Sequence, residues 1–128
     1  MNEDKSREFE VVNRSVPRRD GRAKVSGRAL YVSDVKLTGM AYAKVLRSPY
    51  AHAKIVSMDT SRAESHPGVH NVLRGDDLEG LNPYFGHAVK DHPLIAIDKV
   101  RYAGEPVAAV IANDELTAYE ALELITVE

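Results

Sequence analysis

The chain has 128 residues, of which 44% are hydrophobic, so its length and composition predict about one globular domain with a packed core. Lys and Arg number 17 against 19 Asp and Glu, and the net charge of −2 argues against a dedicated nucleic-acid or membrane-surface protein. The absence of cysteine excludes a disulfide framework, a cysteine-ligated zinc or iron–sulfur site and a thiol nucleophile. No run approaches the roughly 18 apolar residues of a membrane helix, and no apolar signal core opens the sequence, so a cytoplasmic protein is expected.

The beginning of the chain is polar and charged. We expect residues 1–14 to be a flexible segment that precedes a single domain over residues 15–128. Residues 14–28 are basic, and Pro17 and Gly21 make this stretch irregular because proline fixes φ and glycine frees it. The stretch lacks the aromatic residues that a nucleic-acid arm would contain. It is therefore interpreted as an extended arm that is either solvated or turned toward a partner subunit.

Two apolar stretches, 40–47 and 53–59, predict strands, and the short loop between them predicts that they pair as a hairpin. Ser61 and Glu64 have the spacing of a capping box, in which the serine hydroxyl accepts from the amide of the glutamate. The capping box predicts a helix of little more than one turn, because a Pro-Gly pair follows it.

The middle of the chain predicts a short strand over 69–73 and a tight or 3₁₀ turn over 75–78. Residues 79–93 hold two prolines and two glycines and predict a long irregular loop. Loops of this length inside a compact domain are uncommon and are often functional. A further short strand is predicted over 100–102.

The last fifth of the chain predicts a strand–helix–strand unit. Residues 107–112 form a continuous apolar run, as expected of a strand that is buried on both faces. Asn113 is the candidate N-cap of an amphipathic helix of about three turns, and residues 125–128 alternate as a strand. A parallel arrangement of the two strands would be right-handed. The elements together predict an α+β fold.

The histidines are the first candidates for metal or acid–base chemistry. His66 and His70 are four residues apart, but the Pro-Gly pair between them prevents a shared helical face. A metal site, an acid–base pair or a small hydrolase site could form from His87, Asp91 and His92. No nucleophile or oxyanion motif accompanies them, so solvated loop residues are the favoured interpretation.

The acidic turn is the second candidate. Asp76, Asp77 and Glu79 could hold a hard cation, but their spacing is not that of an EF-hand loop, and a charged turn is the favoured interpretation. His52 is interpreted as a turn residue. The sequence also lacks the glycine-rich phosphate motifs and the nucleophile elbow of a serine hydrolase. The residues themselves therefore assign no catalytic or metal-binding set.

Six segments share a pattern with one known family. Residues 24–31 read KVSGRALY, residues 47–55 read RSPYAHAKI, and residues 98–110 read DKVRYAGEPVAAV. Three shorter segments, residues 37–43, residues 59–61 together with 67–69, and residues 75–78, agree as well. In this order they resemble the start of the large subunits of molybdenum hydroxylases, the family of xanthine dehydrogenase, aldehyde oxidase and carbon monoxide dehydrogenase. Thr38 departs from the pattern, because the family usually has proline there.

The resemblance implies an α/β-hammerhead domain, with mixed short strands and a few short helices. It implies an oxidoreductase that hydroxylates aldehydes or nitrogen heterocycles with oxygen from water. Electrons in such enzymes pass from a molybdopterin cofactor through two [2Fe–2S] centres, usually to FAD. In the family, the pterin-binding loops and the catalytic glutamate lie in later domains. No catalytic, cofactor-binding or metal residue is therefore transferred to this chain, which we expect to lack turnover by itself.

The resemblance also implies partners, namely the molybdenum-binding domains of the large subunit, an Fe–S subunit and an FAD subunit. Self-association of the isolated domain is expected if an apolar interface is left uncovered. We expect the long loop to line the mouth of the substrate funnel through Tyr84, Phe85, Leu94 and Ile95. The alternative is a free-standing interaction or scaffold module that reuses the hammerhead fold.

Overall fold

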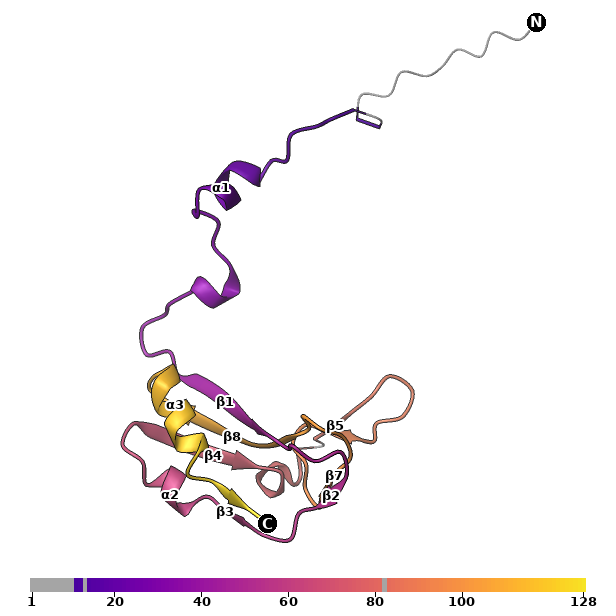
Figure 1. Ribbon diagram of the computed structural model, residues 1–128, viewed down its shortest axis with the longest axis vertical. Coiled ribbons are helices and arrows are strands. Elements are labelled where there is room, and N and C mark those ends of the chain that lie inside the picture. The colour runs from indigo at the N-terminus through magenta and orange to yellow at the C-terminus, as the bar shows by residue number, and fades with distance from the viewer. Residues whose placement is uncertain (1–10, 13, 82) are drawn as a thin grey trace, which may run out of the picture. The chain divides into compact units, whose positions relative to one another are not determined.

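The computed structural model describes residues 11–12, 14–81 and 83–128 (Figure 1). The chain divides into two compact units, Met1–Leu37 and Thr38–Glu128. The flexible segment predicted over 1–14 lies outside the described residues except at positions 11, 12 and 14. The single domain predicted over 15–128 stays a prediction.

The first unit contains a five-residue helix, α1 (Gly21–Val25), and a 3₁₀ helix, η1 (Val32–Asp34), and neither has a buried residue. The Asp20 carboxylate accepts from Arg18 Nε at 2.5 Å and lies 2.8 Å from Lys24 Nζ. The Arg18 guanidinium, followed by the Lys24 ammonium, lowers the pKa of Asp20. The described residues of the first unit thus form short local structure in which neither helix has a buried residue.

A three-stranded antiparallel sheet forms the centre of the second unit. Its strands are β1 (Tyr42–Arg47), β8 (Pro106–Ala112) and β4 (Val69–Arg74), with β8 in the middle. Ala109 of β8 lies opposite both Val45 of β1 and Leu73 of β4. The apolar run predicted as a strand is thus confirmed as the central strand, but the predicted burial of both faces is incomplete, because Ala109 and Ile111 are only partly buried.

Three two-residue ladders, all antiparallel, complete the second unit, and two of them connect segments that are distant in sequence. They are β2 (Ala53–Lys54) with β7 (Lys99–Val100), β3 (Met58–Asp59) with β9 (Thr126–Val127), and β5 (Tyr84–Phe85) with β6 (His92–Pro93). The last ladder is a hairpin inside the predicted irregular loop, and the segment that joins its strands extends away from the three-stranded sheet (Figure 1).

Helix α3 (Glu115–Leu122) packs on the sheet, and the short helices α2 (Ser61–Glu64) and η2 (Asp76–Leu78) flank β4. The main core is made mostly of small apolar side chains, which let the helices approach the sheet closely; they are Ala63, Val72, Val110, Ala112, Ala118, Ala121 and Leu122. A second, smaller cluster consists of Ala96, Val100 and Val107. In the described part of the chain, no helix has the length and apolar character needed to cross a membrane.

The hairpin predicted between 40–47 and 53–59 is wrong. β1 pairs with β8, and the second stretch is divided into β2 and β3, which pair with β7 and β9. After β1 the backbone turns toward the start of β8, because the Ser48 N–H donates to the Glu105 carbonyl at 3.0 Å. This contact with a distant segment replaces the local pairing.

The predicted capping box of α2 is also wrong. The Ser61 hydroxyl donates to Asp59 Oδ1 at 2.6 Å, and the Glu64 amide donates to the Thr60 carbonyl at 2.9 Å. The Glu64 carboxylate accepts from the Thr60 hydroxyl at 2.6 Å. The nearby carboxylate of Asp59 thus engages the serine, and the helix starts with Thr60 as its N-cap.

The N-cap of α3 is Asp114, one residue after the predicted Asn113, because the Asp114 carboxylate accepts from the Thr117 amide at 2.9 Å. The helix has eight residues, which is shorter than the three turns predicted. The strand–helix–strand unit is present, but β9 pairs with β3 and not with β8, so the unit is not a parallel crossover.

The Asp114 cap should make stability depend on pH in a defined direction, and a cap that cannot titrate should remove that dependence. The Thr117 hydroxyl bond, followed by the Thr117 amide bond, lowers the pKa of Asp114 below 3.8, so the folded carboxyl binds a proton less readily than the unfolded one. Its stabilising effect is therefore present above that pH and is lost as the pH falls through the folded pKa. We expect Asp114→Ala to lower the melting temperature at about pH 7, and Asp114→Asn to cap nearly as well.

The measurement is thermal unfolding by circular dichroism between about pH 7 and about pH 3. The melting temperature of the wild type should fall more steeply with acid than that of Asp114→Asn, which keeps the cap but cannot titrate. Equal slopes for the two proteins would contradict this account of the cap.

Candidate functional site

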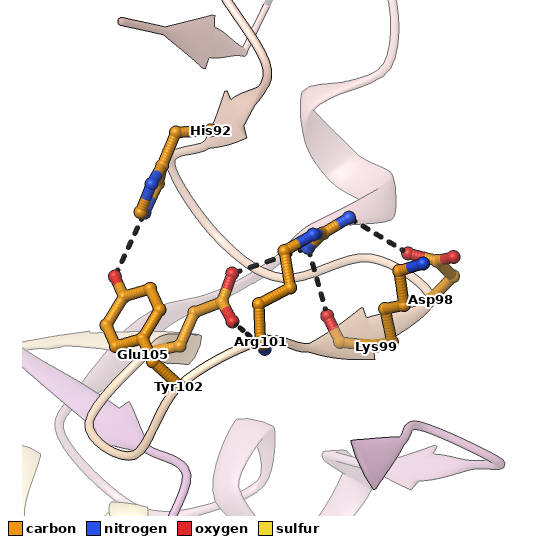
Figure 2. Close-up of polar contacts among 6 residues, drawn as sticks. All are labelled: His92, Asp98, Lys99, Arg101, Tyr102 and Glu105. Atoms are coloured by element: carbon orange, nitrogen blue, oxygen red, sulfur yellow. Dashed lines mark hydrogen bonds and ion pairs between the residues drawn. The ribbon is translucent and has the colours of Figure 1, made fainter. Parts of the chain in front are cut away.

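The turn between β7 and β8 encloses a buried carboxylate. Glu105 is 0% exposed, and its side chain accepts from the backbone amide of Arg101 and, at 3.4 Å, from the Arg101 guanidinium (Figure 2). The same guanidinium donates to the Lys99 carbonyl at 3.2 Å and lies 3.6 Å from Asp98 Oδ1. The buried Glu105 side chain therefore stabilises the 101–105 turn, and Arg101 links this carboxylate to the exposed Asp98.

The 101–105 turn is also bound to the end of β1. The Gly104 amide donates to the Ser48 carbonyl at 2.8 Å, and Arg47 Nη1 donates to the Gly104 carbonyl at 2.8 Å. Gly104 has a φ of +91°, in the left-handed region that favours glycine. The loop that leads into the central strand is thus held by backbone and side-chain contacts together.

His92 joins the β5–β6 hairpin to this turn. Its Nε2 lies 2.9 Å from the Tyr102 hydroxyl, toward which the ring points (Figure 2). The His92 ring centroid lies 4.7 Å from that of Phe85 and 5.4 Å from that of Tyr102. His92 therefore has a packing role, which its sequence neighbours did not indicate.

The candidate set of His87, Asp91 and His92 is not assembled. His87 and Asp91 are exposed, whereas His92 is turned toward Tyr102. Within residues 11–12, 14–81 and 83–128, no group of three or more His, Asp or Glu side chains could hold a metal ion. The described residues thus give no geometric support to a metal site or a hydrolase site in this loop.

The acidic turn is engaged by a cation of the protein itself. Asp77 Oδ2 accepts from the Arg74 amide at 2.7 Å, and Asp77 Oδ1 lies 3.3 Å from Arg74 Nη2. The backbone bond first, and the guanidinium second, lower the pKa of Asp77. Asp76 and Glu79 line a cleft of about 410 Å³ that also includes Tyr84.

The four residues predicted to line a substrate funnel divide into two kinds. Tyr84 and Phe85 of β5 and Leu94 after β6 are exposed, and the Leu94 amide donates to the Pro83 carbonyl at 2.9 Å. Ile95 is only 6% exposed and belongs to the core. Three of the four side chains therefore lie on the surface of one hairpin.

An apolar cleft of about 540 Å³ lies where β1, β2, β7, β8 and β9 meet. Most of the side chains that line it are apolar, and they include Leu46, Ala53, Ile55, Val100, Val107, Ile125 and Val127. Three charged residues, Arg47, Lys54 and Glu128, also line the cleft. The sequence did not predict this cleft, because its walls come from five separate segments and no local pattern marks it.

The described residues do not fit a molybdopterin cofactor. Such a cofactor needs polar groups that face a cavity, but every buried side-chain nitrogen or oxygen in the described part already has a hydrogen-bond partner. The larger cleft is mostly apolar.

Removing the Glu105 carboxylate should destabilise the fold. We expect Glu105→Ala to lower the free energy of unfolding by about 1–3 kcal/mol, because the Arg101 amide loses its acceptor and a buried side chain leaves a void. Asp98→Ala is the matched control, since it removes the exposed second carboxylate that pairs with Arg101 and should cost less than about 1 kcal/mol. Chemical denaturation followed by circular dichroism measures both; equal losses would contradict the role assigned to Glu105.

Comparison with known proteins shows the family to which the chain is related. The family model described as "Aldehyde oxidase and xanthine dehydrogenase, a/b hammerhead domain" matches residues 26–128. A probable xanthine dehydrogenase subunit from Bacillus subtilis is 48% identical over 119 residues, which cover 92% of this chain and 16% of that protein.

Two solved structures agree with the fold. Quinoline 2-oxidoreductase from Pseudomonas putida 86 superposes with a TM-score of 0.80 at 39% identity, over 89% of this chain and 15% of that one. A Cu,Mo-CO dehydrogenase superposes with a TM-score of 0.83 at 39% identity, over 88% of this chain and 14% of that one. The chain thus spans about a sixth of the length of the proteins that it matches. It belongs to the α/β-hammerhead domain family of the aldehyde oxidases and xanthine dehydrogenases.

Proposed function

We propose that this chain supplies the hammerhead domain of a molybdenum hydroxylase large subunit, and that its role there is structural and subunit-docking. The observation that carries the proposal is the family match over residues 26–128 together with the close superposition on two oxidoreductases. Within the described residues no group of three or more His, Asp or Glu side chains could hold a metal ion, and the role proposed for them in the enzyme is through surfaces.

The proposed enzyme hydroxylates nitrogen heterocycles or aldehydes. Two of the three proteins compared are named for nitrogen heterocycles, xanthine and quinoline, and one is named as a Cu,Mo enzyme. In this proposal the molybdopterin cofactor, the [2Fe–2S] centres and FAD are held by other domains and subunits of the assembly. A cytoplasmic location, expected from the sequence, belongs to the same proposal.

A hybrid enzyme tests the domain assignment. In the hybrid, the matching 119-residue region of the Bacillus subtilis relative is replaced by the corresponding residues of this chain. We expect the hybrid to purify with the companion subunits, to contain molybdenum, and to turn over within about tenfold of the parent, or about 1.4 kcal/mol of activation free energy. We expect this because the replaced region and this chain are the same domain, with the same core between α3 and the sheet and the same docking surfaces.

A hybrid carrying Val110→Asp is the negative control, because an unpaired carboxylate in the core prevents folding of the domain. A folded wild-type hybrid that neither assembles nor retains molybdenum would contradict the assignment. That result would favour the free-standing interaction or scaffold module.

The same hybrid tests the proposed lining of the substrate funnel. We expect the combined change of Tyr84, Phe85 and Leu94 to alanine to alter KM, or the kcat/KM ratio between two heterocycles of different size, by about threefold to tenfold, since these side chains present exposed apolar surface on one hairpin. Ile95 is left intact because it is part of the core. Tyr119→Ala, which removes an exposed aromatic ring from α3, is the matched control. Unchanged KM and substrate preference in the triple variant would overturn this role.

A further inference from the structure

Residues 14–37, here called the basic arm, differ in charge from the rest of the chain. The arm carries five Arg and two Lys against two Asp, a net charge of +5. Residues 38–128 carry eight Lys and Arg against thirteen Asp and Glu, a net charge of −5. The near-neutral total therefore hides a strongly cationic segment.

The arm also presents apolar side chains to solvent. Val32 is 92% exposed, Val25 is 88% exposed and Leu30 is 84% exposed. Further exposed apolar residues of the arm are Val16, Tyr31, Val35 and Leu37. This density of exposed apolar surface in a short segment is typical of an interaction site.

Local contacts neutralise only part of the positive charge. Asp20 is engaged by Arg18 and Lys24, and the Asp34 carboxylate accepts from the Tyr31 amide at 2.9 Å. Arg19, Arg22 and Arg28 have no carboxylate partner in the described part of the chain. Three guanidinium groups therefore remain available to carboxylates elsewhere.

Helix α1 is too short to be stable by itself in water, because a helix gains little before its first turns are complete. A surface that covered the apolar side chains would stabilise it. Such a surface would need carboxylates at its border to meet Arg19, Arg22 and Arg28. Arginine and tyrosine are enriched in protein interfaces, whereas lysine is depleted, and the arm has more Arg than Lys.

We propose that the basic arm docks onto a companion subunit of the enzyme, on an apolar patch bordered by carboxylates. This inference rests on the proposed function, since it names the docking element of that domain. A second copy of the chain fits less well, because several of its carboxylates are already engaged. Asp59 is held by Ser61, Asp77 by Arg74 and Asp114 by Thr117, and Glu105 is buried.

The test uses the hybrid enzyme with two changes in the arm. One variant, Arg19→Glu with Arg22→Glu, reverses charge, and the other, Val25→Asp with Val32→Asp, removes apolar surface. Each has a matched control with the same chemical change at exposed positions of the second unit: Arg62→Glu with Lys90→Glu, and Val56→Asp with Val89→Asp. The dissociation constant between the hybrid large subunit and its companion subunits is measured by sedimentation at low and high salt.

We expect both arm variants to weaken association by about tenfold or more, and the controls to change it by less than about threefold. Association of the wild type should weaken with salt, and the charge-reversed variant should lose most of that dependence. The melting temperature of the isolated 128-residue chain should be the same with and without the arm changes, because the arm has no core.

Three results overturn the inference alone: arm variants that associate as the wild type does, arm variants that lower the melting temperature of the isolated chain, or an isolated chain that dimerises through its arm. The second result would mean that the arm packs on its own chain, and the third that its partner is a second copy. A wild-type hybrid that does not assemble instead overturns the proposed function, and this inference with it.

Discussion

The close packing of α3 against the central strand β8 is the constraint on which the second unit depends. Val110 and Ala112 of β8, together with Ala118 and Ala121 of α3, are completely buried. Side chains this small bring the helix backbone near the sheet, so few larger apolar residues are needed to complete the core. In the order β1–β8–β4 both edges of this mostly buried strand are paired, which satisfies its backbone hydrogen-bonding groups.

The 101–105 turn, which leads into β8, connects the central strand to the end of β1 and to the β5–β6 hairpin. Glu105 precedes the strand, and its buried carboxylate engages Arg101, while the backbone of Gly104 and of Glu105 bonds to Ser48 at the end of β1. The neighbouring Tyr102 contacts His92, so the β5–β6 hairpin is attached through the same turn. Buried carboxylates are costly unless hydrogen-bonded, and the partners of Glu105 meet that requirement. The hairpin that carries Tyr84 and Phe85 is therefore positioned by the strand that organises the core.

The sequence correctly predicted those elements that depend on interactions between residues close together in the chain. The apolar run at 107–112, the strand near 69–73 and the 3₁₀ turn near 75–78 are confirmed, because burial and turn residues within a few positions determine them. The hairpin between 40–47 and 53–59 is wrong, since the competing partner of β1, the 101–105 turn, is distant along the chain, with Arg47 and Gly104 separated by 57 positions. The apolar cleft escaped prediction for the same reason, because its walls meet only in the folded chain.

The candidate histidine site shows that closeness in sequence does not bring side chains together in the fold. His87, Asp91 and His92 are neighbours in sequence, but the hairpin turns His92 toward Tyr102 and leaves the other two in solvent.

The net charge of the whole chain does not show how charge is distributed between its segments. A total of −2 argues against a charged partner only if positive and negative groups are mixed, yet the arm and the second unit carry +5 and −5. Because salt screens the interaction between exposed charges beyond about 8–10 Å, the charge of each segment, and not the total, determines what that segment attracts.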